Sequence, residues 1–495
     1  MLKRFIFPIL FFLIILGGFA IRIYDVQDAP LDYHATRQLH SALIARGMYY
    51  ASLPSDQNNA WERTEAIRQQ QLEGIIEPPI MEWLASRGYL LTGTAQLWIP
   101  RVIAIVFWLL AAIGIALLAL DWIGKAGAIT ALGFFLFYPY GVAASRSFQP
   151  ESLLMAVLVW AVWALMRWQR SSAWKWAIVV GVLGGMAMLI KAVSVFFLIG
   201  AWVLVTLIQP EWKKTITSAQ FWVAGGLIAL PTLMYTLYGI FGSGSLMGQF
   251  GMRFFPAYWT DISFYVRWFL TLRKVVAVEW LLIGAVGWLL LESGLLKRLL
   301  TGLWIGYLFL GFTLSYHITT HDYYSLPVFI MVSLAAGASA ERIWKTTEDK
   351  FKRSVLCSLL LFTFLIYGYD AYSAMKRIDF GEEIAFWAAM GEKLGRNARV
   401  TALVEDYGYR LEYWGWLTPI AWMSGGDFSV RADSGSPVAF EPYFLEATKG
   451  RDYFLITDLD EFEKQVQLKQ KLEGNHALLE KTERYLLYDL KVVLQ

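Results

Sequence analysis

The residues best suited to chemistry lie in one polar stretch, residues 25–79, between the first two long apolar runs of the chain. Asp32, His34 and Arg37 stand near its start, and Glu77 precedes two prolines at its end. A carboxylate can accept a proton from an attacking hydroxyl, and a guanidinium can bind a phosphate through two N–H groups. A charged loop in an otherwise apolar chain is therefore expected to serve catalysis or recognition.

A second set of polar and aromatic residues stands at the ends of later apolar runs. The set comprises Arg101, Arg146, Glu151, Lys191, His321, Tyr323 and Tyr324. Ionisable groups are costly in a hydrocarbon layer, so those that persist near a span are candidates for function. The simpler interpretation of Arg101 and Lys191 is that they extend toward lipid headgroups, and the tyrosines could be interfacial belt residues.

The composition indicates that membrane spans must position these residues. The 495 residues are 57% hydrophobic and only 17% charged, whereas about 25% charged residues is usual for soluble domains. The net charge of +3 does not suggest nucleic-acid binding. Cys357 is the single cysteine, which excludes a disulfide within the chain.

About eleven runs are long and apolar enough to be membrane spans, each with about 20 residues. The runs are residues 5–23, 97–120, 126–145, 150–168, 174–190, 192–209, 219–239, 275–291, 299–316, 323–340 and 354–373. The first resembles a signal peptide, but no small-residue cleavage site follows it before the charged loop. It is therefore expected to be a retained signal anchor.

Lysine and arginine in the short loops predict the orientation of these spans. With Lys3 and Arg4 in the cytoplasm, every loop expected on the same side is basic. The opposite side then holds the loop 24–96, the loop 240–274 and everything after residue 374. The sequence therefore predicts a multi-pass membrane protein with a cytoplasmic N-terminus and an extracytoplasmic C-terminal domain. The lack of a retrieval signal and the compactness of the chain favour a plasma (inner) membrane.

The outer segments have structure of their own. Apolar residues at helical spacing in 34–50 and 60–76 predict two helices along the membrane surface. After about residue 376, short strand patterns alternate with helical patterns, which is typical of a small α/β domain. The predicted domains are 1–375, a transmembrane domain, and 376–495, an extracytoplasmic α/β domain.

These motifs resemble the protein O-mannosyltransferase and aminoarabinose-transferase type of GT-C glycosyltransferase, similar to glycosyltransferase family 39. The resemblance rests on the first-loop acid, the two prolines that close the loop, and Arg101 at the second span. It also rests on Ser145-Arg146-Ser147-Phe148-Gln149-Pro150-Glu151 and His321-Asp322-Tyr323-Tyr324-Ser325-Leu326-Pro327. It covers about residues 1–375 and implies a polytopic α-helical GT-C fold.

The resemblance implies inverting transfer of a hexosyl or pentosyl group from a polyprenyl-phosphate donor to a hydroxyl, with a first-loop aspartate as the base. Asp32 is the candidate base, and Asp25 and Asp28 are alternatives. Asp32 could instead only cap the surface helix. Many members of the family have Asp-Glu where this chain has Asp32-Tyr33, and Lys-Pro-Pro where this chain has Glu77-Pro78-Pro79.

The remaining candidates receive roles by residue type. Glu151 is a possible second catalytic acid, or it orients Arg146 through an ion pair. The candidate donor-phosphate ligands are Arg37, Arg101, Arg146 and Lys191. The candidate substrate contacts are Tyr33, Tyr323 and Tyr324. The candidate metal ligands, if the fold gathers them, are His34, Glu77 and His321.

Three functions fit this pattern. The first is glycosyl transfer on the outer face, from a polyprenyl-phosphate sugar to an acceptor lipid, glycan or protein. The alternative is a transporter or flippase for a polyprenyl lipid or solute, but four predicted spans contain no charged residue at their centres. A sensor or scaffold with a partner-binding tail is the third. A divalent metal ion is the only cofactor considered, and no nucleic acid is expected as a partner.

Overall fold

The computed structural model describes the chain except for residues 1, 55–59, 76, 248–253, 434 and 494–495. The chain divides into two compact units. The helical unit consists of Met1–Gln27, Gly74–Gly88 and Trp98–Ile378. The α/β unit consists of Asp28–Glu73, Tyr89–Leu97 and Asp379–Gln495. The polar first loop thus contributes to both units.

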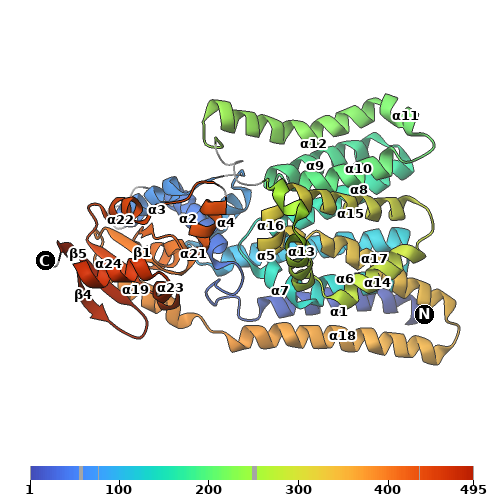
Figure 1. Cartoon of the computed structure of the whole chain (residues 1–495). Coiled ribbons are helices and arrows are strands. Elements are labelled where there is room, and N and C mark those ends of the chain that lie inside the picture. Colours follow the sequence, from blue (N-terminus) through green and yellow to red (C-terminus); the bar gives the residue numbers. More distant parts are fainter. Residues whose placement is uncertain (1, 55–59, 76, 248–253, 434, 494–495) are drawn as a thin grey trace. The chain divides into compact units, whose positions relative to one another are not determined.

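The helical unit is built from helices of very different lengths, most of them apolar, and all are labelled in Figure 1. In chain order they are α1 (Leu2–Ile23), α5 (Trp98–Trp122), α6 (Lys125–Phe137), α7 (Pro139–Arg146), α8 (Glu151–Ser171), α9 (Trp174–Ile190), α10 (Ser194–Thr206), α11 (Trp212–Thr217), α12 (Ala219–Leu237), α13 (Ile262–Val275), α14 (Val278–Leu290), α15 (Leu295–Thr313), α16 (Ser315–Thr320), α17 (Val328–Thr346) and α18 (Lys350–Arg377). Short helical turns η2 (Tyr238–Gly242), η3 (Pro256–Thr260) and η4 (Asp322–Ser325) join some of them. Helix α4 (Ile80–Thr92) begins in this unit and ends in the other.

Within the described residues, five helices have the length and hydropathy of a membrane span, or six if one bent pair counts as a span. The bent pair is α6 and α7, which meet at 60° because Pro139 interrupts the helix. Four shorter apolar helices, α9, α10, α14 and residues 7–23 of α1, add to this set. Ten of the eleven predicted runs therefore overlap one of these apolar helices, and the run 323–340 overlaps α17, which is not among them. The number of helices that cross the membrane remains a prediction.

Glycines allow the helices of this unit to pack closely. Helix α10 lies along α15, and α9 lies along α12, as Figure 1 also shows. A Cβ atom added to Gly200 would lie 2.0 Å from the carbonyl oxygen of Gly302. A Cβ atom on Gly302 would lie 2.2 Å from the carbonyl oxygen of Gly200. Only residues without a side chain permit this backbone contact, which is the usual basis of helix association in membranes.

The α/β unit contains a five-stranded sheet with the order β2-β1-β3-β5-β4. The strands are β1 (Val400–Leu403), β2 (Ile420–Ala421), β3 (Tyr453–Ile456), β4 (His476–Lys481) and β5 (Leu486–Val493). Strands β1, β2 and β3 are parallel, and β5 is antiparallel to both β3 and β4. The helices are α2 (Ala35–Ser52), α3 (Ala60–Leu72), α19 (Gly381–Leu394), α20 (Tyr409–Trp414), α21 (Gly425–Asp433), α22 (Phe440–Thr448), α23 (Leu459–Lys464) and α24 (Val466–Asn475), with the turn η5 (Glu405–Gly408).

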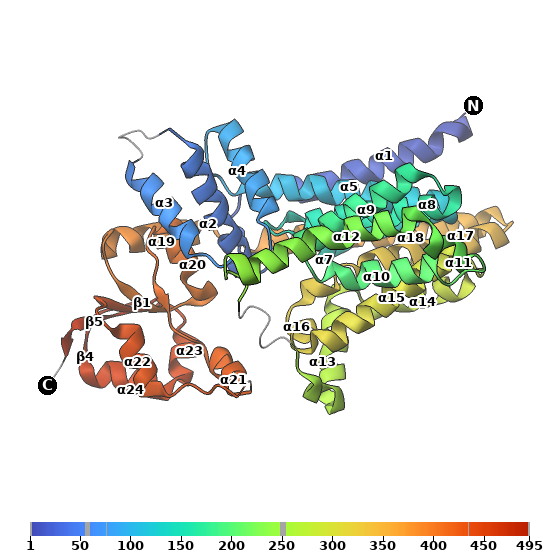
Figure 2. The same ribbon diagram turned by 90° about the horizontal axis from the view of Figure 1, so that it is seen from above.

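The sheet is covered on both faces, because successive strand residues point to opposite sides. Val400 and Ala402 pack with Trp387 of α19, whereas Leu403 packs with Phe444 of α22. Figure 2 shows α19 and α20 on one side of the sheet and α21 to α24 on the other. The predicted α/β architecture after residue 376 and the two predicted helices in the first loop, now α2 and α3, are confirmed.

Candidate functional site

Three buried guanidinium groups gather in the helical unit, where α1 and α7 end and α5 begins. Arg22, Arg101 and Arg146 are each at most 2% exposed. Arg101 Nε donates to the Arg146 carbonyl at 3.1 Å, and Arg22 Nε donates to Ser145 Oγ at 2.7 Å. These bonds join the three residues into one cationic cluster, the arginine cluster.

Backbone carbonyls hold much of this cluster in place. Arg146 Nη2 donates to the Asp25 carbonyl at 2.8 Å, and Arg101 Nη1 donates to the Val26 carbonyl at 3.3 Å. Asp25 has φ 51°, a left-handed conformation that costs a non-glycine residue energy and turns the chain after α1. The segment just after the first helix is therefore shaped around the predicted residues Arg101 and Arg146.

Arg22 belongs to this cluster, although sequence reasoning did not select it. Its Nη1 atom donates to the carbonyls of Gly18 and Leu136, each at 2.8 Å. Its buried Nη2 atom has no hydrogen-bond partner among the described residues. A single arginine in the last turn of the first apolar run was the available signal, because ionisable residues in such runs are rarely incidental.

A buried ion pair lies where α9 ends and α8 begins. Lys191 Nζ donates to Glu151 Oε1 at 2.5 Å, and the exposed fractions of the two residues are 4% and 2%. The ammonium group also lies 4.3 Å from the ring centre of Tyr323 and 4.6 Å from that of Tyr324. Aromatic faces attract a cation, so four predicted site residues meet at one point.

The ion pair and the two tyrosines line a narrow pocket of the helical unit. Leu154, Met155, Phe197, Leu326 and Pro327 supply much of its apolar wall. Ser194 also lines the pocket, and its buried Oγ atom has no hydrogen-bond partner among the described residues. The pocket thus places a cation and an available hydroxyl beside apolar walls, in a volume of about 10 Å³ that holds about one water molecule.

His321 lies beside this pocket, and its neighbour Asp322 is buried. Thr320 Oγ1 lies 2.7 Å from His321 Nδ1, and Lys274 Nζ lies 2.5 Å from Asp322 Oδ2. Glu77 is half-buried in the same unit. Among the described residues, no three His, Cys, Asp or Glu side chains are grouped closely enough to hold a metal ion.

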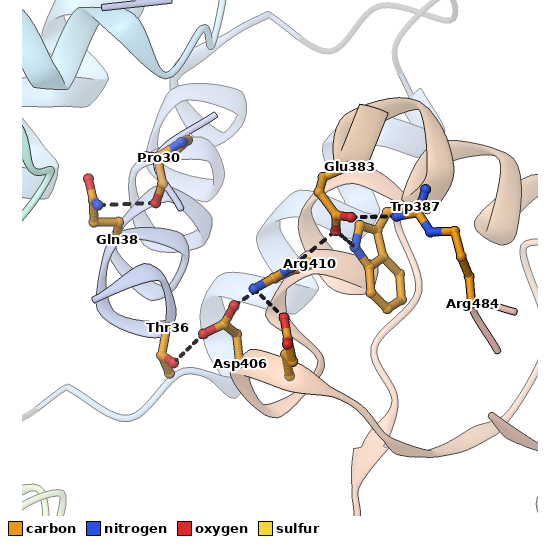
Figure 3. Close-up of polar contacts among 9 residues, drawn as sticks. Pro30, Thr36, Gln38, Glu383, Trp387, Asp406, Arg410 and Arg484 are labelled. Atoms are coloured by element: carbon orange, nitrogen blue, oxygen red, sulfur yellow. Dashed lines mark hydrogen bonds and ion pairs between the residues drawn. The ribbon is translucent and has the colours of Figure 1, made fainter. Parts of the chain in front are cut away.

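The other predicted residues of the first loop belong to the α/β unit. Asp32 is exposed, Tyr33 is buried, and Arg37 is half-buried on α2. His34 is the N-cap of α2, with φ 47° and no side-chain cap hydrogen bond. Gln38 Nε2 donates to the Tyr33 carbonyl at 2.6 Å and to the Pro30 carbonyl at 3.1 Å, and Figure 3 shows the bond to Pro30. Two backbone carbonyls of the Asp32 loop are thus fixed by α2.

Part of the sequence and the whole architecture have counterparts among known proteins. The family model for dolichyl-phosphate-mannose-protein mannosyltransferase matches residues 76–238, which contain Arg101, Arg146, Glu151 and Lys191. No curated protein sequence matches the chain closely enough to count as a relative.

Several solved structures share the fold. ArnT from Cupriavidus metallidurans, solved with bound undecaprenyl phosphate, matches with a TM-score of 0.63 at 14% identity, over 97% of each chain. The archaeal oligosaccharyltransferase AglB from Archaeoglobus fulgidus, solved with an inhibitory peptide and a dolichol-phosphate, matches with a TM-score of 0.56 at 12% identity, over 98% of this chain and 74% of AglB. The arabinofuranosyltransferase AftD from Mycobacteria matches with a TM-score of 0.52 at 14% identity, over 99% of this chain and 40% of AftD. The chain therefore shares the GT-C membrane fold of these solved structures, and its residues 76–238 match the mannosyltransferase family model.

Proposed function

We propose that this protein is an inverting glycosyltransferase that moves a sugar from a polyprenyl-phosphate donor to a hydroxyl acceptor on the outer face of a membrane. The observation that supports this most is the similarity, over 97% of both chains, to ArnT solved with undecaprenyl phosphate. The sugar is a hexosyl or pentosyl group, and the acceptor is a lipid, glycan or protein hydroxyl.

The chemistry needs few groups. As the acceptor oxygen attacks the anomeric carbon, one carboxylate takes the hydroxyl proton. The bond from that carbon to the phosphate oxygen breaks, and the lipid phosphate leaves with its electron pair. Cations stabilise the charge that develops on this phosphate, so no acid is required on the leaving side.

Arg101, Arg146 and Lys191 are proposed to bind the donor phosphate, together with Arg37. The first three side chains are buried by protein, a position that does not fit the lipid-headgroup alternative for Arg101 and Lys191. A buried cation interacts strongly with an anion, because water does not screen the pair. The Tyr323 and Tyr324 rings beside Lys191 are proposed to contact the substrate, as is Tyr33.

Asp32 is proposed as the base, with Asp25 and Asp28 as the competing residues. The structure gives Asp28 a different use, because its Oδ1 atom accepts from the Ala29 and Phe380 backbone N–H groups at 2.8 and 3.0 Å. Glu151 is proposed to place Lys191 rather than to serve as a second catalytic acid, since its Oε1 atom accepts from that ammonium group.

The test is transfer by the purified protein in lipid nanodiscs, with a panel of radiolabelled polyprenyl-phosphate sugars and mixed acceptors. Asp32→Asn should lower the rate at least 1000-fold, on the order expected for loss of a general base. Asp25→Asn and Asp28→Asn, each checked by thermal unfolding, are the matched variants. Full activity of Asp32→Asn would remove it as the base, and absence of transfer with every donor would favour a transporter or flippase.

A further inference from the structure

The sheet of the α/β unit contains a topological switch point. The connection that leaves β1 passes through η5 and α20 to β2 on one side of β1. The connection that leaves β3 passes through α23 and α24 to β4, on the opposite side. Strands β1 and β3 are parallel neighbours, so their carboxyl ends open onto one crevice. In open α/β sheets, this crevice is where ligands bind.

A cleft of about 340 Å³ lies at this switch point. Glu405 follows β1 after one residue, and Thr457, Asp458 and Asp460 follow β3. The other polar wall residues are Glu383 of α19, Arg410 of α20, and Glu483 and Arg484 of the β4–β5 turn. All of these residues belong to Asp379–Gln495, so the cleft is formed within the α/β unit. Its volume suits one or two sugar rings.

Arg410 holds acidic side chains of the cleft wall in place. Its Nη1 atom lies 3.1 Å from Glu383, its Nη2 atom 2.6 Å from Glu405 and its Nε atom 2.6 Å from Asp406. Arg484 also binds Glu383. Figure 3 shows Arg410 among these carboxylates, with Thr36 donating to Asp406 from α2. The network orders the wall before any ligand arrives.

The loop between the wall residues Glu405 and Arg410 has a strained backbone. Asp406 and Tyr407 are consecutive non-glycine residues, and both have φ 54°. A left-handed conformation is unfavourable for a residue other than glycine, and such strained residues are frequent at ligand sites. Tyr407 Oη donates to Asp427 at 2.9 Å, which helps to hold the turn in this form. The strained residues lie in the loop after β1, outside the strands, so the pairing of the strands does not require their conformation.

Two carboxylates of the cleft are available to a ligand. Asp460 and Glu483 are exposed, and among the described residues neither makes a hydrogen bond or ion pair with its side chain. Phe386 contributes a half-buried ring, and the Arg484 guanidinium lies 4.1 Å from its centre. The cleft therefore offers hydrogen-bond acceptors and donors around a small apolar surface.

The charge of the cleft wall disfavours anionic ligands. Its five carboxylates are those of Glu383, Glu405, Asp458, Asp460 and Glu483. Arg410 and Arg484 are its two cations, and both are bound to carboxylates. Five negative charges against two positive ones repel phosphates and uronic acids. Paired hydroxyl groups, by contrast, are suitable donors to carboxylate oxygens.

We propose that this cleft is a saccharide-binding site of the α/β unit that takes an uncharged or amine-bearing sugar unit of one or two rings. Asp460 and Glu483 accept hydrogen bonds from the sugar hydroxyls, and the Arg410 network holds the wall that faces them. The proposal goes beyond glycosyl transfer and stands without it, because no proposed transfer residue lines the cleft.

The experiment is isothermal titration of the full-length protein in detergent with glucose, glucosamine, cellobiose, lactose and glucuronate. We expect saturable binding of at least one uncharged or amino sugar. Glucuronate should bind at least tenfold more weakly than glucose. Asp460→Ala with Glu483→Ala should weaken sugar binding at least tenfold. Glu392→Ala with Glu446→Ala, which removes two exposed carboxylates elsewhere in the unit, should leave it unchanged.

Several results of this experiment would overturn the saccharide-site proposal. Absence of saturable binding for every sugar overturns the proposal, as does equal affinity of the cleft variant and the control variant. Tight binding of glucuronate overturns the argument from charge. Equal melting temperatures of the two double variants establish that the cleft variant is folded. Loss of glycosyl transfer in Asp32→Asn with sugar binding retained would show that the two sites are independent.

Discussion

Lys191 Nζ lies 2.5 Å from Glu151 Oε1 in a nearly water-free part of the helical unit. A buried ion pair is a weak source of stability, because removing two charges from water costs about as much as their attraction returns. This pair lies at a pocket wall beside two tyrosine rings rather than deep in an apolar core. We infer that the Lys191 ammonium is kept for an anionic ligand and that Glu151 maintains its charge and position.

Removal of the Lys191 charge should therefore separate stability from activity. Lys191→Met leaves the Glu151 carboxylate buried without its partner and should lower the free energy of unfolding by about 3–5 kcal/mol. Adding Glu151→Gln should restore most of that stability. Neither variant should transfer sugar at more than about one hundredth of the normal rate, if Lys191 binds the donor phosphate. Thermal unfolding in detergent and initial rates of transfer measure the two effects.

An exposed pair provides the control for this experiment. Lys214 and Glu211 lie 3.6 Å apart, with side chains 85% and 74% exposed. Lys214→Met with Glu211→Gln should change stability by less than about 1 kcal/mol and leave transfer intact. A stable Lys191→Met, Glu151→Gln variant that transfers sugar at the normal rate would contradict the phosphate role.

The contact of Gly200 with Gly302 predicts a large effect of a side chain at this point. Gly302→Leu would place atoms where the α10 backbone lies, and helices α10 and α15 would have to separate. We expect a loss of about 3 kcal/mol or more, above the usual cost of overpacking, because the obstructing atoms belong to the backbone. Gly225→Leu on α12 is the control, since no atom lies within 4 Å of its added Cβ. Similar melting temperatures for the two variants would refute the close packing.

The sequence was most informative where one local pattern decides the structure. Apolar runs predicted helices, and strand-helix alternation after residue 376 predicted the α/β unit. The run 126–145 was predicted as one span, but it forms the bent pair α6 and α7. Pro139 was visible in the sequence, and it lacks the amide hydrogen that a continuous helix requires. The two-residue strand β2 was missed because it is too short for an alternating pattern.

The site was less predictable, because burial depends on contacts between distant parts of the chain. Arg101 and Lys191 stand at the ends of apolar runs, where the sequence favours extension toward lipid. Only packing against α7 and the tyrosines of η4 shows that they are buried. Arg22 was missed for the same reason, since its partner Ser145 is 123 residues away. The grouping of residues 28–73 with residues 379–495 also has no local signal.

Arg46 on α2 illustrates how the first loop is held within the α/β unit. Its guanidinium lies 4.3 Å from the Tyr413 ring centre and 3.9 Å from that of Trp416. Its Nη1 atom donates to the Tyr413 carbonyl at 2.5 Å, and its Nη2 atom donates to Gln69 at 2.6 Å. Arg46→Leu should lower the free energy of unfolding by about 2–4 kcal/mol, since it removes charge-assisted bonds and two cation–π contacts.

Differential scanning fluorimetry and limited proteolysis measure this effect. The matched control is Arg68→Leu on α3, whose side chain is 48% exposed and paired with Glu65. Its loss should be below about 1 kcal/mol. We expect Arg46→Leu, and not Arg68→Leu, to expose residues 28–73 to protease. Equal protection in both variants would show that Arg46 does not anchor the loop.

Glu73, at the end of this loop segment, carries the clearest pH signal in the α/β unit. Burial, with the nearby Glu412 carboxylate, raises its pKa from 4.5 to about 7, and the bond from Tyr409 Oη at 2.9 Å opposes the rise only in part. His40 Nε2 lies 3.3 Å from Glu73 Oε2. The folded protein therefore holds a proton on Glu73 in a range of pH where the unfolded chain has lost it.

The folded protein should lose stability as pH rises through the range in which Glu73 titrates. The stability that proton binding by Glu73 contributes is fully present below about pH 4.5 and is lost as pH rises to about 7, because the folded state binds the proton more tightly. The total loss is on the order of 3 kcal/mol. Glu73→Gln should unfold at a higher temperature than the wild type at pH 8 and should lose less stability between pH 5 and pH 8. Glu446→Gln, at an exposed position on α22, should follow the wild-type curve. Thermal unfolding at half-unit steps of pH measures all three curves, and parallel curves for Glu73→Gln and the wild type would exclude Glu73 as the titrating group.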